Sequence, residues 1–275
     1  MQHPMPHLSS STVAPLRLLP ATEARAVELR ASWARHPAEV REAQRLRHAV
    51  FAEEKGARLR PLPGTAPGLD ADLYDPHCEH LLVRAVPLGE DSGPVVATYR
   101  VLLPEAAKRL GGFYAEQRFD LVRLRAHRPR LAELGRACVH PDHRQGAALL
   151  MMWGEIVALL ARHGVDYALG SVSLCARDGG ARAWAVWQQV ASQHLAPLEW
   201  QVRSRSPLPR PLRPHTGECV LDPLLRGYLK LHAQLLGEPA WDGDFQCADL
   251  PVMVRLDALP GRFRRQLAQP LRWAA

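Results

Sequence analysis

Apolar residues recur along this chain at two spacings, and the spacing predicts the order of its elements. Residues 38–54 carry them three or four apart, which predicts a helix. Residues 147–161 contain one charged residue, Glu155, and predict a helix that is buried on nearly all sides. Further helices are predicted at residues 105–110, 181–190 and 224–236, and strands at residues 16–19, 81–86, 95–103, 133–139, 167–174, 198–202 and 252–256. Strands interspersed with helices favour an α/β or α+β fold.

Proline, glycine and acidic residues mark the connections between these elements. Residues 89–94 predict a hairpin turn that pairs the strands on either side antiparallel. Loops are predicted at residues 56–68, 204–214 and 239–249. With no internal repeat and no clean linker, we expect one domain over residues 16–258, between a disordered tail of residues 1–15 and a basic amphipathic tail of residues 259–275.

The strand at residues 133–139, the turn after it and the apolar helix form the unit on which a functional prediction can be based. Pro141 ends the strand, and Arg144, Gln145 and Gly146 form the turn. A glycine turn leaves free N–H groups at the positive start of a helix, which favours an anion. A phosphate beside a strand edge indicates a phosphopantetheine or nucleotide carrier. The alternative is an ordinary buried strand-turn-helix unit without a ligand, and the stretch alone leaves both open.

Charge and cysteine usage narrow the class of protein. The formal charge is +7 and comes almost entirely from arginine, because the only lysines are Lys55, Lys108 and Lys230. Arginine suits phosphate, carboxylate or an acidic protein partner, although a GC-rich genome also produces this composition. No zinc spacing, helix-turn-helix or aromatic-basic RNA motif supports nucleic-acid binding.

The compartment is predicted from what the chain contains and lacks. The five cysteines are widely spaced without a CxxC pair, which fits a reducing cytoplasm and predicts no metal site. No stretch is apolar for the ~18 residues needed to span a bilayer, and residues 1–14 contain no apolar signal segment. We therefore expect a cytoplasmic protein.

Four ordered segments carry a resemblance to a known family: residues 72–83, residues 112–121, residues 133–144, and residues 225–230 together with 237–249. They resemble the ornithine N-acyltransferases of bacterial ornithine-lipid synthesis, the haemolysin-like branch of the GNAT acyltransferases, and the likeness covers roughly residues 41–256. The resemblance implies a GNAT-like fold, with a central mixed, mostly antiparallel, twisted sheet and helices on both faces. It implies that the sheet splays in its middle and holds the pantetheine arm of an acyl carrier there.

The resemblance also implies an activity. A 3-hydroxyacyl group would pass from acyl carrier protein to the α-amine of ornithine, or of a related amino acid, and give a lyso-ornithine lipid. The donor would be the 3-hydroxyacyl-phosphopantetheine of acyl carrier protein, with no bound cofactor. Alternatives are an acyl-homoserine-lactone-synthase-like enzyme, an acyl-CoA-dependent GNAT enzyme, and a non-catalytic basic scaffold for membrane or nucleic acid.

Two departures bear on those alternatives. Acyl-homoserine-lactone synthases typically carry a tryptophan shortly after an Arg-x-x-x-Phe stretch, and none follows Arg47 to Phe51 here. Only Gln145 separates Arg144 from Gly146, one residue fewer than in a standard coenzyme A pyrophosphate loop, although counting from His143 restores the spacing. A shortened turn would suit the single phosphate of a carrier protein.

The match to the family's Glu-Leu-x-Arg segment assigns catalytic roles to Glu133 and Arg136. Glu133 would act as the general base, through a water molecule, because a carboxylate in a partly dry cleft can have a raised pKa. The alternative is a structural ion pair between the two residues. In a regular strand they point to opposite faces, so both can serve one cleft only if the strand is bulged or begins later.

The end of this strand would bind the donor. Backbone N–H groups of Cys138 and Val139 would stabilise the oxyanion, and His140 would assist or merely cap the strand end. Covalent catalysis by Cys138 is disfavoured because direct amine attack needs no acyl-enzyme. The carrier phosphate would lie on Arg144, Gln145 and Gly146.

An amino acid acceptor needs partners for its carboxylate and, in ornithine, for its side-chain ammonium. Arg100 is the candidate for the carboxylate. Candidates for the ammonium are Asp75, Glu79, Asp244 and Asp249. Each of these residues could equally be a turn former or part of a fold-holding ion pair, as the arginines at 41, 45 and 47 could be a solvated helix face.

Two surface predictions complete the analysis. One arginine surface for the acidic carrier protein is expected from Arg123, Arg125, Arg128, Arg130 and Arg144. The basic C-terminal tail carries Phe263, Leu267, Leu271 and Trp273, and could contact an anionic inner membrane peripherally.

Overall fold

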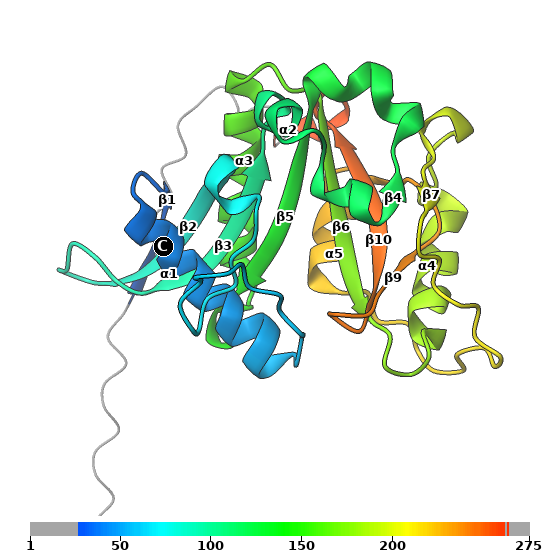
Figure 1. Ribbon diagram of the computed structural model, residues 1–275, viewed down its shortest axis with the longest axis horizontal. Helices are drawn as coiled ribbons and strands as arrows, with labels where there is room; N and C mark the ends of the chain where they lie inside the picture. The colour runs from blue at the N-terminus through cyan, green and yellow to red at the C-terminus, as the bar shows by residue number, and fades with distance from the viewer. Residues whose placement is uncertain (1–26, 262, 264–275) are drawn as a thin grey trace, which may run out of the picture.

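The computed structural model describes residues 27–261 and 263, and within them a single large sheet dominates (Figure 1). Its eight strands run in the order β1-β2-β3-β5-β6-β10-β8, and β9 pairs with β10. The strands are β1 Val27–Trp33, β2 Glu79–Pro87, β3 Val95–Leu102, β5 Leu131–Val139, β6 Tyr167–Cys175, β8 Gln234–Leu235, β9 Ala240–Asp242 and β10 Cys247–Arg255. A second, two-stranded sheet pairs β4 Phe119–Asp120 with β7 Arg203–Ser204. In the described part, β5 and β6 are the parallel neighbours of the large sheet and its other pairs are antiparallel.

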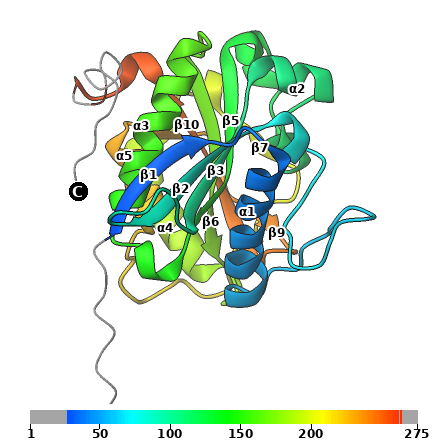
Figure 2. The same ribbon diagram turned by 90° about the vertical axis from the view of Figure 1, so that its left-hand side faces the viewer.

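Helices cover both faces of the sheet. They are α1 Pro37–His48, α2 Pro104–Leu110, α3 Ala147–Arg162, α4 Ala181–His194 and α5 Pro223–Lys230. Figure 2 shows α1 on one face of the sheet and α3 on the opposite face. The larger apolar core joins α3, α4 and α5 to the sheet, and a smaller one joins α1 to Cys138 of β5. The predicted mixed, mostly antiparallel sheet with helices on both faces is confirmed.

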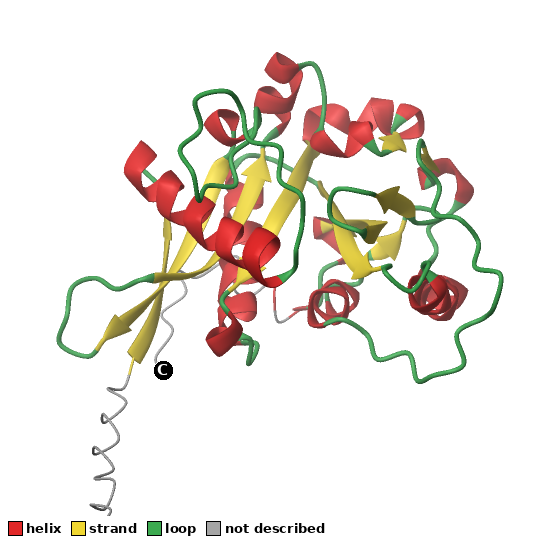
Figure 3. Ribbon diagram, turned by 60° about the horizontal axis from the view of Figure 1, so that its bottom comes forward, coloured by secondary structure: helices red, strands yellow, loops and turns green. Residues whose placement is uncertain are grey.

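The two central strands separate halfway along their length. Parallel pairing of β5 with β6 runs from Leu131 opposite Tyr167 to Leu134 opposite Gly170, and ends there. Beyond that point the strands diverge and divide the sheet into two halves (Figures 1 and 3). Gly170 lies at the branch because a Cβ there would come 2.2 Å from the Tyr228 hydroxyl oxygen, which hydrogen-bonds the Tyr99 hydroxyl at 2.8 Å.

A β-bulge in β5 lies at the same level as the branch. Thr98 of β3 is opposite Cys138 and Arg100 is opposite Gly135, so two steps along β3 match three along β5. The extra residue places Arg136 at a φ of 54°, which few residues other than glycine adopt. The bulge meets the condition under which Glu133 and Arg136 can serve one cleft.

Most predicted elements are confirmed, and several are corrected. The strand β1 was missed, although its residues alternate in polarity; residues 16–19, predicted as the first strand, lie outside the described residues. Residues 198–202 are not a strand, because Leu198–Trp200 is a 3₁₀ helix. The helix predicted at 224–236 ends at Lys230, since His232 has a φ of 59° and the chain then forms β8. The acidic loop predicted at 239–249 contains β9 and the start of β10.

Predictions were also made for the two terminal tails and for the absence of a membrane-spanning segment. Residues 1–15 lie outside the described residues, as does most of the tail at 259–275, whose Leu267, Leu271 and Trp273 therefore stay untested. Phe263 is buried in the larger core, so this residue of the proposed membrane tail packs inward instead. Among the described residues, no helix combines the length and apolar character needed to cross a bilayer.

Candidate active site

The divergence of the two central strands encloses a cavity of about 720 Å³. Residues Gly135 to Val139 of β5 line one wall, and Ser173, Leu174 and Cys175 of β6 line the other. In a continuous sheet the backbone groups of these strands would bond each other; here the gap leaves room for a ligand between them. The cavity therefore lies between the two halves of the sheet.

Glu133 lies at the branch, where the strands still pair, and its side chain lines the cavity. Its carboxylate accepts hydrogen bonds from the backbone N–H groups of Tyr114 at 2.6 Å and Ala115 at 2.8 Å. Burial raises the pKa of Glu133 to about 7, although these two bonds and the charge of Arg100 act to lower it. A carboxyl group with this pKa can accept a proton at neutral pH. Its hydrogen bonds also fasten the 3₁₀ helix Tyr114–Gln117 to β5.

Arg136 does not pair with Glu133; its ion pairs go to the aspartates of the loop before β2. Arg136 Nε lies 3.1 Å from Asp70 Oδ2 and Nη2 lies 3.4 Å from Asp72 Oδ2. The guanidinium stacks between the rings of Tyr114 and Phe245, each centroid 5.2 Å away. The ion pair between Glu133 and Arg136 that was considered as the alternative is therefore not formed, because Arg136 pairs with Asp70 and Asp72 instead. Glu133 and Arg136 both line the cavity.

Behind Arg136 lies a network of buried charges, which we call the buried ion network: Arg47, Asp70, Asp72, Asp75, Arg100 and Arg136. Arg47 donates to Asp70 at 2.9 Å and to Asp75 at 2.7 Å, and Arg100 Nη1 donates to Asp72 at 2.6 Å and Asp75 at 2.9 Å. Burial alone would raise the pKa of Asp75, but the charges of Arg47 and Arg100 outweigh it and lower that pKa. Arg47 is fully buried, so the prediction of a solvated face is wrong for this residue while Arg41 and Arg45 are exposed.

At the end of β5 the predicted donor-binding groups divide into those that face the cavity and those that do not. His140 donates its N–H to Val96 of β3 at 2.7 Å. Because the amides of a strand alternate in direction, the Cys138 N–H also faces β3, and the Val139 N–H faces the gap. Of the two N–H groups expected to bind the donor, only that of Val139 therefore points toward the cavity.

The surroundings of two side chains there favour roles other than catalysis. Burial raises the pKa of the Cys138 thiol to about 12, so it stays protonated at neutral pH and is a poor nucleophile. His140 lies outside the cavity lining, and its Nδ1 accepts the Asp142 N–H at 3.4 Å. The contact caps the 3₁₀ helix Pro141–His143, which follows the strand whose end His140 was expected to cap.

The turn before α3 lies at the mouth of the cavity. Gly146 has a φ of 102° as the residue before the helix, and both Gly146 and Arg144 line the cavity. Arg144 holds Glu54 through Nη1 at 2.8 Å and Nη2 at 2.7 Å. Gln145 lies outside the lining and donates to the Asp142 carbonyl at 2.8 Å, so it closes the turn.

The acceptor candidates are dispersed. Arg100 and Asp249 line the cavity, whereas Asp75, Glu79 and Asp244 do not. Both oxygens of Asp75 belong to the buried ion network, Asp244 holds the exposed Arg60 at 2.7 Å, and Glu79 is exposed at the start of β2. Ion pairs therefore account for Asp75 and Asp244.

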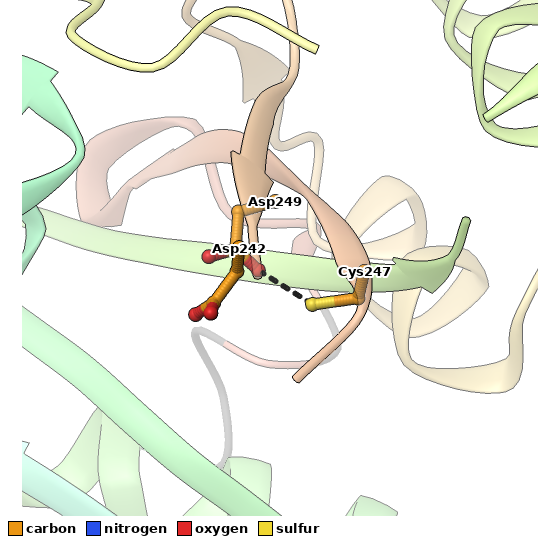
Figure 4. A group of neighbouring side chains, drawn as sticks. All are labelled: Asp242, Cys247 and Asp249. Carbon is orange, nitrogen blue, oxygen red and sulfur yellow. Dashed lines mark hydrogen bonds between the residues drawn. The ribbon is translucent and has the colours of Figure 1, made fainter. Parts of the chain in front are cut away.

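A polar group around Asp249 was largely missed by the sequence analysis. Asp249 Oδ1 accepts the Ser173 hydroxyl at 2.6 Å, and Arg118 lies between Asp249 and Asp242. Figure 4 shows Asp242, Cys247 and Asp249 pointing toward one another from β9 and β10. The i, i+2 spacing of Cys247 and Asp249 on a strand was the one available signal that they share a face.

These three residues are also the described group whose side chains could reach one metal ion. Their ligand atoms lie within 4.8 Å of one another. Arg118 already neutralises Asp242, and burial raises the pKa of the Cys247 thiol, which keeps it protonated. Both features disfavour a metal ion at this place.

The prediction that five arginines form one surface for a carrier protein is wrong. The 3₁₀ helix Val122–Arg130, which carries Arg123, Arg125, Arg128 and Arg130, ends where β5 begins. Arg144 lies beyond the other end of β5, after its last residue. A strand of this length spans about 26 Å, so these arginines lie at opposite ends of β5. Arg128 is paired with Glu116, and Arg130 with Asp166 at 2.6 Å. The positive groups that do line the cavity are Lys55, Arg144, Arg177 and Arg182, together with Arg100, Arg118 and Arg136 deeper inside.

The comparisons with known proteins assign this site to a class. The family described as "Acetyltransferase (GNAT) domain" matches residues 46–154. The fold and the split sheet accordingly define an acyltransferase of the GNAT class.

Curated relatives define the family within that class. An L-ornithine N(alpha)-acyltransferase of Rhodobacter capsulatus is 36% identical over 238 residues, 84% of this chain and 91% of that protein. One of Rhizobium meliloti is 30% identical over 87% of this chain and 84% of that protein. The chain belongs to the L-ornithine N(alpha)-acyltransferase family. Among solved structures, the AHL synthase LasI overlaps with a TM-score of 0.49 at 13% identity, over 86% of this chain and 96% of that one.

Proposed function

We propose that this acyltransferase moves a 3-hydroxyacyl group from acyl carrier protein to the α-amine of L-ornithine, giving a lyso-ornithine lipid. The observation that carries the proposal is a buried carboxyl group at the branch of the split sheet, Glu133, whose pKa is raised to about 7. The cavity between the separated strands supports an extended pantetheine arm as its occupant, and the position of Glu133 at the branch supports a base beside that arm's thioester. The relatives are L-ornithine N(alpha)-acyltransferases, which supports ornithine as the acceptor.

The proposed reaction follows from these positions. Glu133, through a water molecule, takes a proton from the ammonium of the acceptor, and the freed amine attacks the thioester carbonyl. A C–N bond forms, and the developing oxyanion accepts the Val139 N–H. Collapse of the intermediate breaks the C–S bond, and the nitrogen gives up its second proton to the leaving phosphopantetheine thiolate. The proton held by Glu133 then passes through the water molecule to solvent. No acyl-enzyme is required, in agreement with the protonated Cys138 thiol.

The acceptor would lie between the polar groups of the two walls. We assign the side-chain ammonium of ornithine to Asp249, whose partner Ser173 is exposed to the cavity. The α-carboxylate is assigned to Arg100, which lies in the lining close to Glu133 and whose described ion pairs run through Nη1. Burial raises the pKa of Asp249, and a neighbouring ammonium would restore its charged form.

The donor is proposed to be acyl carrier protein in preference to acyl coenzyme A. The short Arg144-Gln145-Gly146 turn offers fewer convergent N–H groups than a pyrophosphate loop. Arg144, Gly146 and Lys55 all line the cavity, which supports a site for one phosphate.

Thiol release is the test of this proposal. The protein is incubated with a 3-hydroxyacyl carrier protein and, in parallel, with L-ornithine, L-lysine, L-alanine or no amino acid, and the free thiol is followed with time. The same acyl chain on coenzyme A is run beside it. We expect the largest kcat/KM for ornithine with the carrier protein. Equal values for alanine and ornithine would contradict the acceptor, and equal values for the two carriers would contradict the donor.

A further inference from the structure

An anion from the chain itself already occupies the turn at the cavity mouth. The two guanidinium ends of Arg144 hold both oxygens of Glu54, at 2.8 and 2.7 Å, and its Nε donates to the Val139 carbonyl at 3.1 Å. All three nitrogens of Arg144 are therefore engaged. This is the fork-to-fork arrangement in which arginine also binds phosphate.

Glu54 reaches this position from the face of the sheet that α1 covers, whereas α3 covers the other face (Figure 2). It is the last residue of the π-helical segment Ala49–Glu54 that follows α1, and both Glu54 and Arg144 line the cavity. The space in front of α3 is open, because a Cβ built on Gly146 meets no atom within 4 Å. Lys55 follows Glu54 and also lines the cavity; in the part of the chain that is described its ammonium pairs with no carboxylate and lies 6.0 Å from the centre of the Phe51 ring.

The contact is also exposed enough to be exchanged. The side chains of Arg144 and Glu54 are 40% and 36% accessible, against 1% and 3% for Arg47 and Asp75. Ion pairs at such exposure contribute little to stability, so an incoming anion can displace one at small cost. A phosphate offers the same fork of oxygens and would also reach Lys55 and the start of α3.

We propose that Glu54 is a displaceable occupant of the donor's phosphate subsite, and that the phosphate of phosphopantetheine takes its place on Arg144 when the donor enters. This inference rests on the proposed function. It adds that each donor must break the Glu54–Arg144 pair, so that Glu54 weakens binding of every phosphate-bearing donor.

The test measures binding of two small probes by calorimetry at fixed ionic strength: 4′-phosphopantetheine, and pantetheine, which lacks the phosphate. Three full-length proteins are compared: the wild type, Glu54→Gln and Glu53→Gln. Glu53 is the matched control, because it is the adjacent exposed carboxylate, pairs with His48 at 3.2 Å and lies outside the cavity lining. Removing it changes the net charge equally without touching Arg144.

Glu54→Gln should bind 4′-phosphopantetheine roughly two- to fivefold more tightly than the wild type, the range that an exposed ion pair is worth. Glu53→Gln should match the wild type, and pantetheine should bind all three alike. Equal or weaker binding of 4′-phosphopantetheine by Glu54→Gln would refute the displacement, since Glu54 would then only support Arg144. A wild type that binds both probes equally would refute the phosphate subsite itself, and with it the donor proposal.

Discussion

Two sets of arginine–carboxylate pairs differ in burial: one lies behind the wall of the cavity and the other at its mouth. In the buried ion network, Arg47 and Asp75 are 1% and 3% accessible, and Asp75 is shared with Arg100. At the mouth, Arg144 and Glu54 form one pair that is more than a third exposed on both sides. The same chemistry therefore serves two purposes, because breaking a buried pair leaves a charge without water and breaking an exposed pair does not.

The positions of the two sets agree with this difference. The buried ion network joins α1, the loop before β2, β3 and the β5 bulge, so it fixes Arg100 and Arg136 relative to Glu133. The mouth pair joins the end of the π-helical segment to the turn before α3, where a donor must enter. We expect the first to govern stability and the second to govern donor binding.

The largest expected effect is on the buried side. Asp75→Asn should lower the free energy of unfolding by about 3–5 kcal/mol, because Arg47 and Arg100 lose their shared counter-charge. Asp244→Asn is the control: the same substitution at a pair with the exposed Arg60 should cost less than about 1 kcal/mol. Urea denaturation of both proteins at pH 7 measures the difference.

The same comparison has a pH dependence. The folded-state pKa of Asp75 is lowered, so its stabilising contribution is present above the unfolded-state pKa and is lost as the pH falls. The difference in free energy of unfolding between the wild type and Asp75→Asn should become smaller below pH ~4. If Asp75→Asn and Asp244→Asn lowered the free energy of unfolding equally at pH 7, the distinction between buried and exposed ion pairs would be contradicted.

A smaller effect on stability, with a separate effect on binding, is expected at the mouth. Arg144→Met should change the free energy of unfolding by less than about 1 kcal/mol. It should raise KM for the acyl carrier protein donor roughly tenfold, because charge-assisted bonds to the phosphate are lost. Arg58→Met removes an equal charge from an exposed arginine outside the lining and should leave KM near its wild-type value. An unchanged KM in Arg144→Met would remove this residue from the donor site.

The contrast also explains which parts of the fold could be predicted. The hairpin of β2 and β3, the strand β5 and the helix α3 follow from local pattern, because their apolar faces coincide with the core that they meet. Buried charge has no such local signal. An arginine in a helix, such as Arg47, is expected to be exposed. Its burial is favourable only because Asp70 and Asp75, from a loop distant in sequence, pair with it.

The acidic stretch at residues 239–249 was misjudged for the same reason. Asp242 and Asp249 resemble turn residues, yet both are buried on strands because Arg118 and Ser173 partner them. Strand β1 did offer a signal, since Val27, Leu29, Ala31 and Trp33 alternate with polar residues. Of the candidate site, the Glu-Leu-x-Arg segment and the turn were located from sequence, whereas Glu54, Ser173 and Asp242 required the fold.

The central claim is that Glu133 is the general base, and its alternative is an anchor for the helix Tyr114–Gln117. The measurement that separates them is the pH dependence of kcat/KM for the wild type and Glu133→Gln, with folding of both checked by circular dichroism. For the wild type we predict a rise with pH whose midpoint lies near the Glu133 pKa of about 7, since only the ionised group accepts a proton. Glu133→Gln should remain folded, lose this dependence and turn over about 10²–10⁴ times more slowly. A folded Glu133→Gln protein with near-normal turnover at every pH would contradict the account.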